Sequence, residues 1–197
     1  MSHARHRRRK ALALALFVAV CGLAWLAVHR AQPDWYARIF YPLEHVETIR
    51  SEAARYDLEP ALIAAVIRQE SGWVPDSRSA PGAVGLMQVL PSTARFIADQ
   101  KERPSPPPDQ LVDPAVNIAY GSWYLRYLVD RYGSTRSALV AYNAGETNLA
   151  EWIAKARTAG RTFAFPADVP FPETRAFVTD VEHDIGVYRR AYGVELR

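Results

Sequence analysis

Glu70 is the residue whose type and position most clearly suggest chemistry. Steps of four from Leu62 and Val66 place its carboxyl on the apolar face of a helix, near the C-terminal end. Burial and the negative end of the helix dipole both disfavour the charged carboxyl, so its pKa should be raised. Such a group can act as a general acid, as in cleavage of a glycosidic bond. If the last turn frays, Glu70 faces water instead, and spacing alone leaves both interpretations open.

A second set of candidates lies in the glycine-containing stretch 79–94. Gly85 allows close approach of the backbone, Met87 offers an adaptable apolar contact, and the Gln88 amide can hydrogen-bond sugar hydroxyl or acetamido groups. A glycine turn that leads into a helix is also ordinary connecting structure. By itself this stretch is therefore a weak signal.

Residues 138–145 close another helix with Tyr142 and Asn143. The Tyr142 hydroxyl can donate a hydrogen bond to a substrate oxygen or to Glu70, and Asn143 can cap the helix or hold the next loop. A core tyrosine beside an Asn and Gly helix end explains the same residues. Spacing does not decide between a binding role and a structural one.

In their order along the chain, these motifs resemble the catalytic domain of the soluble-lytic-transglycosylase (SLT) family of bacterial peptidoglycan lytic transglycosylases, which has a goose-lysozyme-like fold. The resemblance covers about residues 45–192. The sequence departs from the common pattern at Trp73 and Phe177, where Phe and Tyr are more usual, and in the proline-rich stretch 101–110. The matching segments are Glu70-Ser71-Gly72-Trp73, Ser79 to Ala94, Asp113-Pro114-Ala115-Val116-Asn117-Ile118, Ala141-Tyr142-Asn143-Ala144-Gly145 and Pro172-Glu173-Thr174-Arg175-Ala176-Phe177-Val178.

The resemblance implies roles for individual residues. The essential glutamate of the family is the one followed by serine, so Glu70 is the implied catalytic acid and base. The family's glycan cleft is lined at the positions of Ser79, Met87, Gln88, Tyr142 and Glu173. We expect no metal and no organic cofactor. We expect substrate contact from Ser79, Gly85, Met87, Gln88, Tyr142 and Asn143, and a supporting role for Ser71 and Glu173.

The implied reaction is non-hydrolytic cleavage of the β-1,4 bond between N-acetylmuramic acid and N-acetylglucosamine. Glu70 protonates the glycosidic oxygen, and the muramyl 2-acetamido group stabilises the cation. Glu70 then accepts the proton of the C6 hydroxyl as a 1,6-anhydro ring closes. One carboxylate therefore suffices where an ordinary glycosidase uses two. The alternatives are a hydrolytic muramidase of lysozyme type and a non-enzymatic, membrane-anchored glycan-binding scaffold.

Helices are the elements that must position these residues. Apolar positions recur mostly at helical spacing, with helix-starting prolines and helix-ending glycines between the runs. The expected fold class is mainly α, a lysozyme-like helical domain with at most a small β-ribbon at 76–89. Residues 101–110 are too proline-rich for regular structure and predict an exposed excursion. The predicted helices are 45–56, 60–71, 91–100, 113–132, 134–143, 147–158 and 173–192.

The composition excludes several other classes of protein. With 197 residues, 49% of them hydrophobic, the chain is globular, and a single cysteine allows no internal disulfide and no multi-cysteine zinc site. The five histidines form no close pair at metal-ligand spacing. Six basic residues and no acid lie within residues 1–30, so residues 31–197 carry a net charge of −3. A mildly acidic domain cannot rely on phosphate contacts, so nucleic acid is not an expected partner.

The N-terminus predicts a membrane anchor. A basic cluster at residues 5–10 precedes eighteen uncharged residues, 11–28. As a helix this run measures about 27 Å, close to the hydrocarbon thickness of a bilayer. The basic end should stay in the cytoplasm, with the rest of the chain outside. A cleaved signal sequence and a lipoprotein modified at Cys21 are the alternatives, but neither has a well-formed cleavage site here.

The predicted organisation follows from this anchor. We expect a cytoplasmic tail at 1–10, the anchor at 11–28, a juxtamembrane linker at 29–44, the catalytic domain at 45–192 and a short tail at 193–197. The protein should be single-pass in the inner (cytoplasmic) membrane, with its domain in the periplasm or cell-wall space. Its expected partners are peptidoglycan glycan strands and the membrane. An envelope assembly is a further candidate, although the chain has no motif specific to one.

Overall fold

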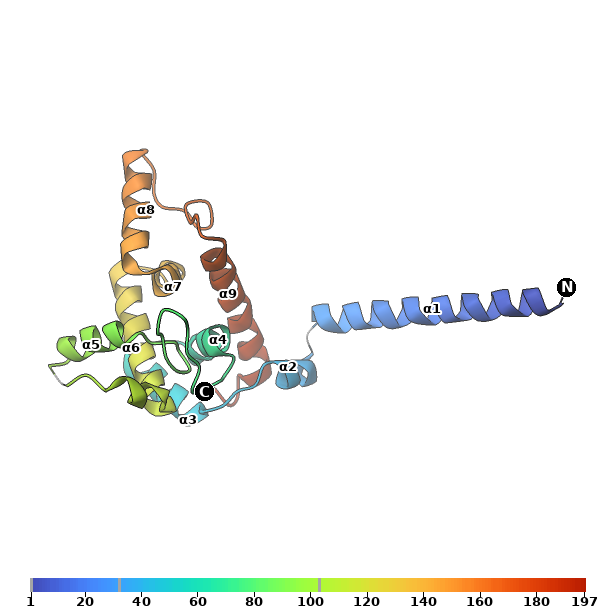
Figure 1. Ribbon diagram of the computed structural model, residues 1–197, viewed down its shortest axis with the longest axis horizontal. Helices are drawn as coiled ribbons and strands as arrows, with labels where there is room; N and C mark the ends of the chain where they lie inside the picture. Colours follow the sequence, from blue (N-terminus) through green and yellow to red (C-terminus); the bar gives the residue numbers. More distant parts are fainter. Residues whose placement is uncertain (1, 32, 103) are drawn as a thin grey trace.

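The computed structural model of the protein describes residues 2–31, 33–102 and 104–197. Met1, Gln32 and Arg103, which fall in the predicted tail, linker and excursion, lie outside the described residues. Figure 1 shows a group of helices from which the first helix projects. The elements are α1 (Ser2–Ala31), α2 (Asp34–Phe40), α3 (Val46–Tyr56), α4 (Pro60–Ser71), α5 (Pro91–Gln100), the 3₁₀ helix η1 (Pro108–Val112), α6 (Pro114–Tyr132), α7 (Thr135–Ala144), α8 (Glu146–Thr158) and α9 (Pro172–Tyr192).

The predicted helices are confirmed as α3 to α9, and their ends differ from the predictions by at most one residue. Within the described ranges the stretch 76–89 contains no strand, only the isolated antiparallel bridges Arg78–Val84 and Val84–Val89. Two elements were not predicted. They are α2, which lies in the expected linker, and η1, which begins inside the proline-rich excursion.

Local signals explain where the helices begin and end. Proline occupies the first position of α4, α5, α6 and α9, where its missing N–H costs no intrahelical hydrogen bond. The Asp113 side chain caps α6 by accepting a hydrogen bond from the Val116 amide at 3.0 Å. Gly72 and Gly133 end α4 and α6 with φ of 59° and 73°, a left-handed conformation that glycine adopts without strain.

Helix α4 is the central element of the core. Residues 61–67 are all buried, so this helix is surrounded by other elements and does not lie on the surface. Its main neighbour is α9, which packs along it. The Trp73 indole, just after α4, donates a hydrogen bond to the Tyr188 hydroxyl of α9 at 3.0 Å. The end of α4 is therefore held from the α9 side by packing and by a polar contact.

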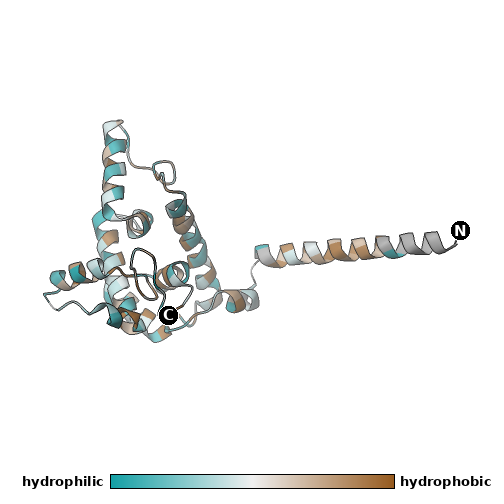
Figure 2. Ribbon diagram, viewed as in Figure 1, coloured by the Kyte–Doolittle hydropathy of each residue, from teal (hydrophilic) through white to brown (hydrophobic). Residues whose placement is uncertain are grey.

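Helix α1 extends away from the other helices (Figure 1), and hydrophobic residues occupy its middle (Figure 2). Its apolar side chains, such as Leu16 and Phe17, are largely exposed. The predicted anchor at 11–28 lies within α1. In the part of the chain that the structure describes, no helix has the length and apolar character needed to cross a membrane.

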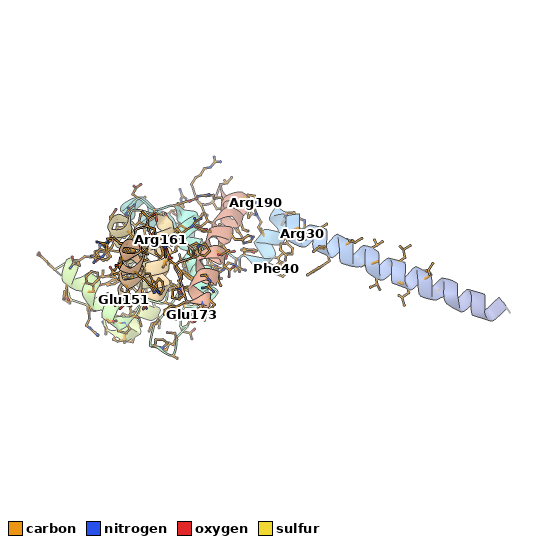
Figure 3. All side chains as sticks on the ribbon, turned by 90° about the horizontal axis from the view of Figure 1, so that it is seen from above. Arg30, Phe40, Glu151, Arg161, Glu173 and Arg190 are labelled. Atoms are coloured by element: carbon orange, nitrogen blue, oxygen red, sulfur yellow. The ribbon has the colours of Figure 1, made fainter. Side chains whose placement is uncertain are left out.

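Helix α2 packs against α9. Ala37 and Tyr41 are buried, and the Tyr192 hydroxyl donates a hydrogen bond to the Tyr41 carbonyl at 2.8 Å. Arg38 donates to the Ala191 carbonyl at 2.9 Å and forms an ion pair with Glu195 at 2.7 Å. Figure 3 places Phe40 of α2 at the end of α9 that carries Arg190. The residues predicted as a linker thus contain a helix attached to the domain.

Candidate active site

Glu70 lies in the last turn of α4, whose preceding residues 61–67 are buried. The helix continues to Ser71, whose hydroxyl donates a hydrogen bond to the Ile67 carbonyl at 3.1 Å. The last turn is therefore intact, and the frayed alternative does not apply. Glu70 keeps a partly exposed surface. Burial raises the pKa of its carboxyl to about 8, so the side chain is a neutral acid at neutral pH that a ligand can still reach.

Tyr142, on α7, is the titratable side chain whose electrostatics are coupled to Glu70. Burial raises the pKa of its phenol well above the ordinary range, and the charge of ionised Glu70 raises it further. The hydroxyl donates its hydrogen bond to the Met87 carbonyl at 2.7 Å, where the sequence suggested Glu70 or a substrate as acceptor. Tyr142 thus links the loop after α4 to α7.

Gly85 allows the loop to approach α6 closely. Its φ is 85°, and a side-chain carbon at this position would lie 2.2 Å from the Asn117 amide nitrogen and 2.4 Å from the Leu111 carbonyl oxygen. The Asn117 side chain and the Leu111 backbone occupy this space, so a side chain at position 85 cannot be accommodated unless they move. Gly85 therefore lets the loop follow its path against α6.

Asn117 of α6 holds this loop by hydrogen bonds, a role that the sequence alone did not indicate. Its side chain is fully buried and uses three hydrogen bonds. The carbonyl oxygen accepts from the Met87 amide at 2.7 Å, and the amide group donates to the Val84 and Leu111 carbonyls at 2.8 and 2.7 Å. The available signal was a polar amide on the same helix face as Tyr120 and Gly121.

The Met87 side chain is fully buried and packs against Gly121 of α6. A side-chain carbon on Gly121 would lie 2.5 Å from the Met87 sulfur. The predicted apolar contact with a substrate is not available in this conformation, because packing takes up the whole side chain. What Met87 presents to the site is its carbonyl oxygen, bound to Tyr142.

Gln88 and Ser79 shape the same loop. The Gln88 amide donates to the Ser77 and Gly85 carbonyls at 3.1 and 2.9 Å, and its backbone has a φ of 46°. The Ser79 hydroxyl accepts a hydrogen bond from the Ala83 amide at 3.0 Å. Both side chains are partly exposed. Gln88 and Ser79 therefore stabilise the loop by hydrogen bonds while part of each side chain stays exposed to solvent.

A hollow of about 220 Å³ brings together three of the predicted site residues, Gln88, Tyr142 and Asn143. Tyr124 of α6 also lines it, and its ring centre lies 5.7 Å from that of Tyr142. A hollow with aromatic rings and amide groups suits a polar, uncharged ligand such as a sugar. The hollow is lined by Gln88, Val89, Leu90, Thr93, Tyr124, Tyr142, Asn143, Ala144 and Gly145.

Asn143 joins this hollow to the start of α9. Its side-chain oxygen accepts a hydrogen bond from the buried Thr174 hydroxyl at 2.7 Å. Glu173, the neighbour of Thr174, is exposed in the first turn of α9. The hydrogen bond to Asn143 thus comes from Thr174, and Glu173 is exposed to solvent beside it in the chain.

A second carboxylate, Glu146, is bonded to Tyr124 and was not among the predicted residues. It forms an ion pair with Arg131 at 2.9 Å. The hydroxyls of Tyr124 and Tyr132 also donate to it, at 3.4 and 3.3 Å. Glu146 is therefore tied by an ion pair and two hydrogen bonds to its neighbours, whereas Glu70 has no such partner among the described residues.

Fold and site together define a mainly helical domain built around one buried acid, the class that includes lysozyme-like domains. The family model "Transglycosylase SLT domain" matches residues 47–163, and the chain belongs to this family. It is 34% identical over 157 residues to the soluble lytic murein transglycosylase of Escherichia coli K12, covering 78% of this chain and 24% of that protein. Thus the chain spans about a quarter of the length of that relative.

Other relatives and solved structures agree. The membrane-bound lytic murein transglycosylase C of Actinobacillus pleuropneumoniae is 38% identical over 119 residues, which is 55% of this chain and 31% of that protein. The structure of the 70 kDa soluble lytic transglycosylase from Escherichia coli superposes with a TM-score of 0.73 at 33% identity, covering 80% of this chain and 26% of that one. The resemblance and the mainly helical, lysozyme-like fold are confirmed.

Proposed function

We propose that the protein is a peptidoglycan lytic transglycosylase that cleaves the β-1,4 bond between N-acetylmuramic acid and N-acetylglucosamine. The observation that carries the proposal is Glu70, an accessible acid whose pKa burial raises to about 8, at the end of a buried helix. Membership of the SLT family and the names of the relatives support it.

The proposed mechanism uses Glu70 twice. As a neutral acid it protonates the glycosidic oxygen, while the substrate's own 2-acetamido group stabilises the cation. The resulting carboxylate, which is poorly solvated in its apolar surroundings, takes the proton of the C6 hydroxyl as the 1,6-anhydro ring closes. Tyr142 and Asn143 line the neighbouring hollow and are proposed to contact the sugar. Gly85, Met87, Gln88 and Ser79 act by fixing the loop, with Ser71 and Glu173 in support.

Mass spectrometry of the products tests this function. The full chain and Glu70→Gln are incubated with purified peptidoglycan at about pH 6, where the acid is protonated. We expect 1,6-anhydro-muropeptides from the wild type and a loss of at least about 100-fold in the variant. Products heavier by one water would indicate a hydrolytic muramidase. Equal release by both proteins would exclude Glu70 as the acid, and no release would favour the glycan-binding scaffold.

We also propose that residues 11–28 attach the protein to the cytoplasmic membrane, with residues 45–192 as the catalytic domain on its outer side. The support is the run of eighteen uncharged residues behind a basic cluster. Carbonate extraction of membranes from cells that express the full chain tests this. We expect retention in the membrane fraction, and release of a variant that lacks residues 2–31. Release of both proteins would contradict the proposed attachment.

A further inference from the structure

The Glu70 carboxyl has no hydrogen-bond donor of its own among the described residues, and burial is the one cause that raises its pKa. A carboxyl without such a partner is positioned by its own backbone and by the atoms packed around it. The placement of the acid therefore depends on how firmly the last turn of α4 is held.

A buried carboxylate on α9 holds that turn. Asp184 is 3% exposed, and one of its oxygens accepts two hydrogen bonds from α4. The Gln69 amide donates at 2.6 Å and the Arg68 Nε at 3.1 Å. These two residues directly precede Glu70 in the chain. The other carboxylate oxygen lies 3.1 Å from the Nδ1 atom of His183.

Arg68 also contacts the last residue of α2 and the residue after it. Its Nη1 donates to the Phe40 carbonyl at 2.9 Å, and its guanidinium carbon lies 3.9 Å from the centre of the Tyr41 ring. The ring offers a favourable surface to the cation and limits its movement. Arg68 is thus held between α9 and the residues that lead out of α2, and the last turn of α4 is held with it.

We propose that Asp184 is a positioning residue for the reaction, which acts through Arg68 and Gln69 to hold the last turn of α4 so that Glu70 stays aligned with the glycosidic oxygen. This inference rests on the proposed function of Glu70. A misplacement of about 1 Å can lower a rate by about 100-fold without weakening binding. Loss of the Asp184 carboxylate should therefore lower kcat and leave KM unchanged.

Asp184→Asn tests the inference, because it keeps the shape and removes the charge that both donors share. With soluble glycan strands as substrate, we expect kcat to fall roughly 10-fold or more with KM within about 2-fold of the wild type. Water that enters beside a loosened turn would also lower the pKa of Glu70. The alkaline side of the pH profile should therefore shift to lower pH, with Tyr142 the other titratable side chain facing Glu70.

A matched control separates positioning from general stability. Glu52, on α3, is another buried carboxylate with an arginine partner, Arg55 at 3.2 Å, and it lies outside the last turn of α4. Glu52→Gln should lower the melting temperature as Asp184→Asn does, yet keep kcat and the pH profile of the wild type. Equal kcat for the two variants, corrected for the folded fraction, would overturn the inference.

A second pair of variants keeps the test decisive if Asp184→Asn does not fold. Arg68→Lys retains the positive charge and loses the planar contacts, and Gln69→Ala removes one donor while the ion pair remains. Both should lower kcat at constant KM. Wild-type kcat in both would overturn the inference, whereas an inactive wild type would contradict the proposed function itself.

Discussion

At the scale of the residue, the two carboxylates Glu70 and Glu146 have different surroundings. Glu146 has Arg131 as an ion-pair partner and accepts hydrogen bonds from two tyrosine hydroxyls. Glu70 has no such partner among the described residues, and burial raises its pKa to about 8. A general acid for a reaction near neutral pH needs an environment like that of Glu70. The structure supplies this environment by burying the carboxyl.

The stability of the folded protein should report this buried acid. Because the folded pKa lies above the unfolded value of 4.5, the folded state holds a proton that the unfolded state has released, and stability falls as the pH rises from about 4.5 to about 8. Glu70→Gln removes this effect. We expect the variant to gain on the order of 5 kcal/mol over the wild type at high pH and little at low pH, measured by urea unfolding.

The exposed Glu151 provides the control for that experiment. Glu151→Gln should change the free energy of unfolding by a similar small amount across the same pH range. A difference between wild type and Glu70→Gln that does not vary with pH would contradict the buried, neutral state of the acid.

At the scale of the element, the loop between α4 and α5 depends on contacts with α6. Asn117 supplies three hydrogen bonds to it and to the neighbouring backbone, and Gly85 and Gly121 leave the space that these contacts require. Tyr142 adds a further bond from α7 to Met87. The loop is therefore a fixed wall of the site, although it contains no regular secondary structure.

Two glycines of this loop form a matched pair for mutation. Gly82 and Gly85 both have positive φ, of 91° and 85°, but a side-chain carbon meets nothing within 4 Å at Gly82 and lies 2.2 Å from Asn117 at Gly85. Gly82→Ala should cost about 1 kcal/mol from backbone strain. Gly85→Ala should cost about 3 kcal/mol or more because neighbouring backbone must move as well. Equal losses in thermal unfolding would contradict the close approach to α6.

The helices were predictable because their ends carry local signals such as Pro60, Asp113 and Gly133. The roles of Met87 and Asn117 could not be predicted, because they depend on contacts between segments far apart in sequence. The sequence shows only that Met87 stands beside Gln88. The packing against Gly121 shows that the Met87 side chain is internal, and the hydrogen bond from Tyr142 shows where the Met87 carbonyl faces. Helix α2 was missed for the same reason: its burial comes from α9.

At the scale of the whole molecule, the segment that leads into the domain is part of its structure. Tyr188 and Tyr192 of α9 donate hydrogen bonds to the carbonyls of Pro42 and Tyr41, and Arg38 pairs with Glu195. Sequence patterning predicted a domain start at 45 because these contacts join residues about 150 positions apart in the chain. The described contacts attach α2 to the same body that holds Glu70.

Truncations should locate this structural boundary. Removal of residues 1–33 should leave the melting temperature unchanged, since the buried residues of α2 remain. Removal of residues 1–44 takes away the buried Tyr41 ring and several hydrogen bonds, and should cost about 3 kcal/mol of unfolding free energy. If the two truncated proteins were equally stable, the segment would be a linker after all.

The central claim, that Glu70 is a neutral acid in the folded protein, is tested most directly by titrating its carboxyl. Carbon-13 NMR of protein labelled at glutamate side chains, with Glu70→Gln used to assign the signal, follows the ionisation of this one group. The structure predicts a midpoint at about 8. A midpoint near the ordinary 4.5 would contradict the account, because the side chain would then be ionised at neutral pH and could not donate the proton.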